Sequence, residues 1–206
     1  MNNFFAPVAA FLAALLYAGP TCAQWAELPQ SPSVLAKYTN CPMRGGLAAV
    51  YIDRAPRLPM VRPVETACGH KSVSVADGYR VILAFPDKDP FVNLKIEIST
   101  SGRYELDKQT ILEQMQFLAD DSSGGVPLER ARRGEVDIAS FTNPDFTHGV
   151  ISFYTLFNDK KNIVASAYIL NQKPERRAFQ DMQQYRALRD RFIDDLVSCI
   201  SSTHQE

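Results

Sequence analysis

Apolar and polar positions in the C-terminal half of the chain predict a strand hairpin followed by a long helix. Residues 150–157 and 163–170 are rich in β-branched and aromatic side chains, and the polar run 158–162 between them is typical of a hairpin loop. Neither face of the first segment is clearly polar. We therefore expect an antiparallel pair inside a sheet that is covered on both sides.

The long helix is predicted by apolar positions that recur every three or four residues. These positions begin at Phe179 and continue through Phe192 and Leu196 to Cys199. Pro174 lies upstream, where the first turn of a helix tolerates a residue without a backbone N–H. The pattern predicts an amphipathic helix at the C-terminal end of the domain.

A second strand pair is predicted earlier in the chain. Residues 79–85 and 91–99 have the apolar content of strands, and a Pro-Asp turn follows the first of them. The second alternates apolar positions with Asn93, Lys95 and Glu97. We expect this polar side of the strand to meet water.

A shorter helix and a third hairpin complete the predicted elements. Asp107 is the candidate N-cap of a helix that continues to Asp120 and stops at the Ser-Ser-Gly-Gly sequence 122–125. Residues 126–132 and 135–141, separated by an Arg-Gly turn, predict two further strands.

The order of these elements predicts an α+β fold in which an antiparallel sheet is flanked by helices. The chain has 206 residues, of which 46% are hydrophobic, and this suits one main domain. We assign that domain to residues 78–206. Residues 24–77 contain many prolines and only one plausible strand, 47–52, so we interpret them as an N-terminal extension.

The first 23 residues have the pattern of a secretory signal peptide. They carry no charged side chain, and an apolar core at residues 8–17 is followed by Ala18-Gly19-Pro20. We expect cleavage after Ala23 and a periplasmic or secreted protein that meets the membrane only during export. Two alternatives stay open: a retained anchor, for which the apolar core is short, and a lipoprotein modified at Cys22, for which a lipobox is lacking.

The cysteines of an exported chain are expected to form disulfides. After loss of Cys22 three cysteines would be left, and we predict that Cys41 pairs with Cys68 and fastens the N-terminal extension. Closing this loop would stabilise the fold by about 3 kcal/mol. Cys199 lies on the apolar face of the long helix, where we expect a buried free thiol. The alternative is earlier cleavage with a Cys22–Cys199 disulfide.

The element order from residue 78 to residue 200 resembles the PsbP/DcrB type of α/β/α sandwich. The resemblance rests on the strand that opens with Gly78-Tyr79-Arg80-Val81, on the strand 163–170, and on the closing helix that ends Leu196-Val197-Ser198-Cys199-Ile200. It implies a fold used in extrinsic photosystem subunits, envelope proteins and chaperone-like adaptors that bind partners, and it carries over no catalytic residue. The extension departs from this pattern, and we expect this protein's own specificity there.

Candidate catalytic and metal-binding residues are few. Asp145 and His148 precede Ser152, and the three residue types would suit a hydrolase triad, but we interpret Asp145 and His148 as turn residues. Cys68-Gly69-His70 places two potential metal ligands together without a second pair, and no phosphate-binding loop is found. We therefore predict no catalytic site, no metal and no cofactor.

The net charge of −1 lacks the basic excess that nucleic-acid binding needs, so nucleic acid is not expected as a partner. We predict a non-catalytic protein-binding or adaptor protein that recognises another envelope or secreted protein through a sheet edge or the N-terminal extension. An inhibitor or immunity protein of an envelope-acting enzyme is one specific form of this function. The alternatives are an envelope hydrolase that uses the Ser, His and Asp residues above, and a small-molecule or lipid carrier with an apolar pocket between sheet and helices.

Overall fold

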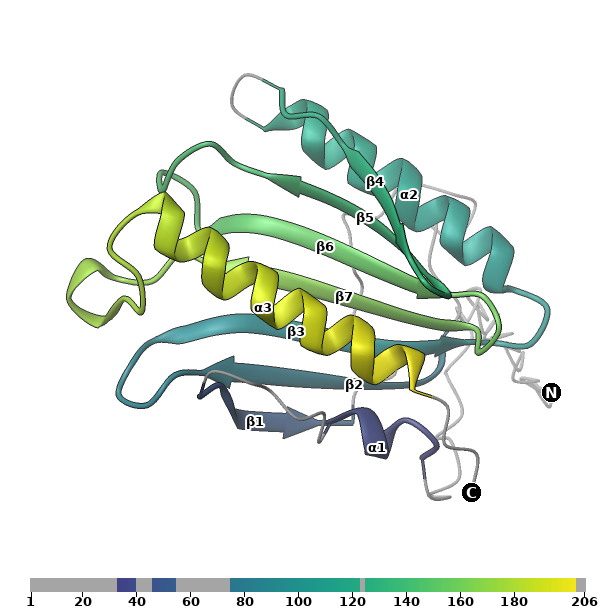
Figure 1. The fold of residues 1–206 in the computed structure, drawn as a ribbon. Coiled ribbons are helices and arrows are strands. Elements are labelled where there is room, and N and C mark those ends of the chain that lie inside the picture. The colour runs from purple at the N-terminus through teal and green to yellow at the C-terminus, as the bar shows by residue number, and fades with distance from the viewer. Residues whose placement is uncertain (1–32, 40–45, 55–74, 123–124, 203–206) are drawn as a thin grey trace, which may run out of the picture. The chain divides into compact units, whose positions relative to one another are not determined.

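One antiparallel sheet organises the part of the chain that the computed structural model describes, which is residues 33–39, 46–54, 75–122 and 125–202 (Figure 1). Within these residues the sheet has seven strands in the order β1-β2-β3-β7-β6-β5-β4, and every neighbouring pair is antiparallel. The strands are β1 (Ala48–Asp53), β2 (Val75–Ala84), β3 (Pro90–Ser99), β4 (Glu129–Arg133), β5 (Val136–Thr142), β6 (Val150–Asn158) and β7 (Ile163–Leu170).

The helices of the described residues confirm the predicted α+β class. They are α1 (Ala36–Thr39), α2 (Tyr104–Asp121) and α3 (Met182–Ser201), with a single 3-10 turn, η1 (Pro174–Arg176), before α3. The predicted hairpin 150–157/163–170 is confirmed as β6 and β7, which pair with Leu156 opposite Ala165. The other two predicted strand pairs are confirmed as β2–β3 and β4–β5.

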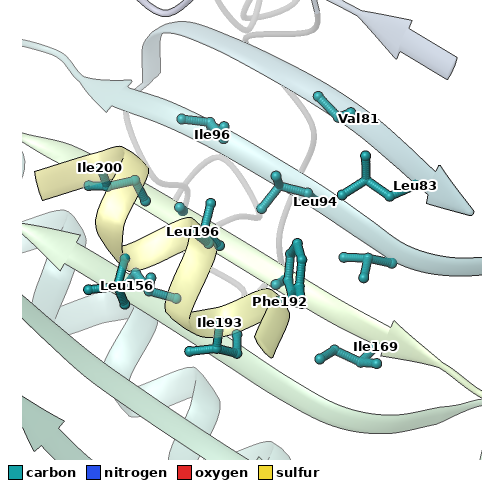
Figure 2. Close-up of a cluster of buried hydrophobic side chains, with 14 of the residues drawn as sticks. Val81, Leu83, Leu94, Ile96, Leu156, Ile169, Phe192, Ile193, Leu196 and Ile200 are labelled. Atoms are coloured by element: carbon teal, nitrogen blue, oxygen red, sulfur yellow. The ribbon is translucent and has the colours of Figure 1, made fainter. Parts of the chain in front are cut away.

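Helix α3 covers one face of the sheet and builds the larger part of the core. Figure 2 shows Phe192, Ile193, Leu196 and Ile200 of α3 lying over apolar side chains of the central strands, and all four are buried. Complete burial of one such side chain contributes about 1.5–3 kcal/mol. The strand residues in this cluster include Val81, Leu83, Leu94, Ile96, Leu156, Ala165, Ala167 and Ile169.

Helix α3 begins later than the apolar periodicity predicts. Phe179 is buried but lies in the turn before the helix. Asp181 is the N-cap, and its carboxylate accepts the backbone N–H of Gln184 at 2.8 Å. A local side-chain to backbone hydrogen bond therefore sets the start of the helix, whereas the apolar pattern continues through the preceding turn.

Helix α2 packs on the opposite face of the sheet. Its residues Ile111, Met115 and Ala119 cluster with Phe153 and Phe157 of β6. Leu156 and Phe157 are neighbours in β6 but belong to different clusters, because successive side chains of a strand point to opposite faces. The sheet is thus covered on both faces, as the apolar character of residues 150–157 predicts.

The predicted N-cap of α2 is wrong. The helix begins at Tyr104, and Asp107 lies inside its first turn, where its backbone N–H donates to the carbonyl of Arg103 at 2.9 Å. Tyr104 is buried, and its hydroxyl donates to Asp159 at 2.8 Å. This contact between distant residues adds a turn at the N-terminus that local capping preferences did not indicate.

The expectation that the polar side of β3 meets water is also wrong. Lys95 and Glu97 are only 7% and 3% exposed. β3 is an interior strand, between β2 and β7, and α2 on this face brings Asp107 close enough to affect the pKa of Glu97. Alternation identified the side on which these residues lie, but the packing of other elements decided their burial.

Several predictions concern residues outside the described ranges. These are the signal peptide 1–23, most of the extension 24–77, His70, and the pair Cys41 and Cys68. The strand predicted at 47–52 is present as β1 and pairs with β2 at the edge of the sheet, in the same compact unit as the remaining strands.

The expectation of a free thiol at Cys199 is wrong, because this residue is disulfide-bonded. Its partner cysteine lies outside the described residues. An apolar helix position suits a packed thiol and a half-cystine equally, so the periodicity of the helix did not distinguish the two.

Candidate functional site

The two edges of the sheet have opposite surface chemistry. All residues of both edge strands, β1 and β4, are exposed. The sequence of β4 is Glu-Arg-Ala-Arg-Arg, whereas β1 is Ala-Ala-Val-Tyr-Ile-Asp. Charged side chains protect an edge strand from pairing with another chain, and an apolar edge lacks that protection. We therefore treat β1 as the candidate docking edge.

Three large side chains define the docking edge. Val50, Tyr51 and Ile52 are 61%, 48% and 46% exposed, and they are among the few large hydrophobic side chains of the described residues that are exposed to at least this degree. The pairing of β1 with β2 shifts register between Ala49 and Tyr51. Val50 lies at this irregularity, whereas Tyr51 and Ile52 stand opposite the successive residues Ile82 and Val81 and so present apolar surface on opposite faces of the strand.

Contacts at the end of β1 hold the strand against the sheet. Arg54, directly after β1, donates from Nε to a carboxylate oxygen of Asp77 at 2.9 Å. The same carboxyl group accepts from the hydroxyl of Ser33. Asp77 lies in β2, so the contact with Arg54 ties the C-terminal end of the docking edge to the neighbouring strand, and the contact with Ser33 ties the residues before α1 to the same carboxyl group.

A second candidate surface is a cavity of about 410 Å³ beside α2. It lies between this helix and the β4–β5 hairpin, which run alongside each other in Figure 1. We call it the basic cavity; its lining residues are Lys108, Leu112, Arg130, Ala131, Arg132, Asp137, Ile138 and Phe157. Three of these eight are cationic and one is acidic.

Ion pairs fix most of the charged groups of the basic cavity. Lys108 donates from Nζ to Asp137 at 3.0 Å and to Asp159 at 2.7 Å. Arg132 lies 3.5 Å from the other carboxylate oxygen of Asp137. The ammonium of Lys108 also lies 5.5 Å from the ring centroid of Phe157. The guanidinium of Arg130 makes no hydrogen bond or ion pair with the residues that the structure describes.

The pKa values of the paired groups follow from this arrangement. Burial works against the charge of Asp159, but the hydrogen bonds from Lys108 and Tyr104 lower its pKa. Burial likewise works against the charge of Lys108, and the hydrogen bonds to Asp159 and Asp137 raise its pKa. Both groups are therefore held in their charged forms near neutral pH.

The structure does not assemble the candidate triad. Ser152 is completely buried, and its hydroxyl oxygen accepts from Tyr185 at 2.6 Å and lies 2.8 Å from the hydroxyl of Thr142. Asp145 accepts hydrogen bonds from the hydroxyl and the backbone N–H of Thr147, and these lower its pKa. Between residues 125 and 202 no hydrogen bond joins His148 to Asp145 or Ser152.

Sequence reasoning missed the basic cavity. Arg130 and Arg132 are two residues apart in β4, so they project from the same face of the strand, and Asp137 stands opposite Arg132 in β5. In the sequence, the two-residue spacing of these arginines predicts that one face of the strand is charged. The contributions of Lys108 and Phe157 come from distant elements, and no local pattern indicates that these two side chains meet.

Neither a metal site nor a membrane span is found in the part of the chain that the structure covers. In that part no three His, Cys, Asp or Glu side chains gather closely enough to hold a metal ion. None of its helices combines the length and apolarity needed to cross a bilayer. Comparison of the chain with protein-family models, with curated proteins and with solved structures found no match.

Proposed function

We propose that this chain is an exported, non-catalytic protein-binding protein that docks an extended segment of another envelope or secreted protein on β1. The observation that carries this proposal is the contrast between the two edges of the sheet. The exposed edge strand β4 carries charged side chains that disfavour pairing with another chain, whereas β1 presents Val50, Tyr51 and Ile52 to solvent. An apolar edge of this kind is a liability unless a partner uses it.

Strand addition is the binding mode that β1 suits. Among the described strands β1 pairs only with β2, and the proposed partner segment would pair with the backbone N–H and C=O groups on its other side. Hydrogen bonds to the backbone would supply affinity, and contacts with the side chains of residues 50–52 would supply specificity. The expected occupant is an extended segment of the partner with apolar residues at alternate positions.

The remaining parts of the proposal come from the sequence. The pattern of residues 1–23 supports export to the periplasm or the exterior. The antiparallel sheet with a helix on each face supports a PsbP/DcrB-like sandwich, a fold that would serve binding rather than catalysis. An inhibitor or immunity protein that neutralises an envelope enzyme is the specific form of this function that we favour.

Site-specific photo-crosslinking tests the docking edge. A photoreactive aromatic residue replaces Tyr51 in the protein as it is exported by living cells. The matched control carries the same residue in place of Phe117, which is exposed to 58% but lies on α2. We expect the photoreactive residue at position 51 to crosslink one partner, with labelling that saturates and maps to a single contiguous segment of that partner. We expect no such labelling from position 117.

Purified partner then gives the quantitative test. Val50→Lys and Tyr51→Lys add charge to an edge strand, and we expect each to weaken binding by at least about tenfold, since a desolvated lysine in a strand interface is costly. Equal labelling at positions 51 and 117, or affinity unchanged in both lysine variants, would reject docking at β1.

A further inference from the structure

We infer that the basic cavity beside α2 is a binding site for a small amphipathic monoanion, a molecule with one carboxylate attached to an apolar chain or ring. This site lies at the β4 edge of the sheet, whereas the docking edge is β1. The inference therefore stands independently of the proposed protein partner.

The shape and lining of the cavity suit the apolar part of such a ligand. Its volume of about 410 Å³ lies within the range of roughly 300–1,000 Å³ that is typical of small-molecule sites. Leu112 of α2 and Phe157 of β6, which belong to the cluster on the α2 face of the sheet, supply apolar surface from two elements. An apolar group of the ligand would displace water from these side chains.

The charges of the cavity select an anion rather than a cation. Asp137 is the single acidic lining residue, and its two oxygens already face Lys108 at 3.0 Å and Arg132 at 3.5 Å. Asp159 provides a second contact for Lys108. No carboxylate of the lining is therefore left to hold a cationic ligand.

The same count of charges favours a single negative charge. The three cations Lys108, Arg130 and Arg132 outnumber the two carboxylates Asp137 and Asp159 by one. Arg130 is the group that no described residue neutralises. Its guanidinium can hold a carboxylate through two parallel hydrogen bonds, a geometry that a point charge such as an ammonium does not offer. We assign Arg130 as the residue that binds the carboxylate, at the mouth of an apolar pocket.

Titration of the purified protein with sodium octanoate tests this assignment. Octanol has the same chain without the charge, and octylammonium has the opposite charge. Backbone amide shifts report where each compound binds. We expect octanoate to saturate with a dissociation constant of about 1 mM or tighter, given the small size of the probe. Its shifts should centre on residues 108–112 and 130–138, and the other two compounds should bind at least about fivefold more weakly.

Two variants with the same loss of charge identify the carboxylate-binding residue. Arg130→Gln removes the proposed contact while the Lys108–Asp137 and Lys108–Asp159 pairs are retained. Arg186→Gln removes an exposed guanidinium from α3, on the other face of the sheet. We expect octanoate affinity to fall about fivefold to tenfold in Arg130→Gln and to be unchanged in Arg186→Gln.

Four results would overturn the inference. They are the absence of saturable octanoate binding, equal binding of octanol or octylammonium, shifts centred outside the cavity, and equal affinities of the two variants. None of these results bears on crosslinking at position 51, so failure of this site and failure of the docking edge are distinguishable.

Discussion

Substitution of Glu97 by Gln tests how the buried polar side of β3 controls stability. Glu97 is 3% exposed, and its Oε1 atom has no hydrogen-bond partner. Burial raises its pKa to about 7, and the nearby carboxylate of Asp107 adds to the rise, whereas Lys95 acts to lower it. Glutamine has the same shape and carries no charge at any pH, so Glu97→Gln removes only the ionisation.

The sign of the effect follows from the direction of the pKa change. The folded chain holds the proton of Glu97 more tightly than the unfolded chain, in which the pKa is 4.5. The stabilising contribution is therefore fully present below about pH 4.5 and is lost as the pH rises to about 7. The difference between 4.5 and about 7 corresponds to about 3 kcal/mol of unfolding free energy, an amount comparable with a large fraction of the stability of a small domain.

Urea unfolding followed by circular dichroism at pH 5 and at pH 8 measures this loss. Burial lowers the pKa of Lys95, whose deprotonation would act in the opposite sense at higher pH, so the series stops at pH 8. Part of the contribution is already lost at pH 5, so we expect the loss of unfolding free energy between pH 5 and pH 8 to be about 2–3 kcal/mol smaller in Glu97→Gln than in the wild type. The control is Glu105→Gln, because Glu105 is exposed in the first turn of α2.

Comparison of the two variants separates the effect of Glu97 from other titrating groups. Groups elsewhere in the protein contribute equally to the pH dependence of the wild type and of both variants, so only the difference is interpreted. If Glu97→Gln and Glu105→Gln give the same pH dependence as the wild type, burial of Glu97 does not raise its pKa and the argument fails.

Two further predictions concern the side of the sheet that α3 covers. Phe192→Ala should lower the unfolding free energy by about 3–5 kcal/mol, because the ring is fully buried between α3 and the sheet. A loss under about 1 kcal/mol in urea unfolding would contradict this packing. Tyr185→Phe should lower the unfolding free energy by about 1–3 kcal/mol, because the buried hydroxyl of Ser152 loses one hydrogen-bond partner. A double-mutant cycle with Ser152→Ala should show coupling between the two substitutions. Additive losses would indicate that the 2.6 Å hydrogen bond is not formed.

Local periodicity was sufficient to predict most of the secondary structure. The hairpin of β6 and β7 was predicted from its β-branched and aromatic residues on either side of a polar loop. The long helix α3 was predicted because its apolar residues repeat with the spacing of a helix. Alternation also predicted correctly which residues of β3 share a side. The N-terminus of α2 was mispredicted because its position depends on a hydrogen bond from Tyr104 to Asp159, a residue far away in the sequence.

The sequence alone therefore determined the type and order of the elements, since these depend on the spacing of neighbouring side chains. Only the tertiary structure decided that β1 is an edge strand with Val50, Tyr51 and Ile52 exposed, and that Glu97 is buried. It also decided that Lys108, Arg130 and Phe157, from three separate elements, line one cavity. The physical reason is that burial and the convergence of charges depend on which distant elements pack together, and a single sequence gives no direct measure of that packing.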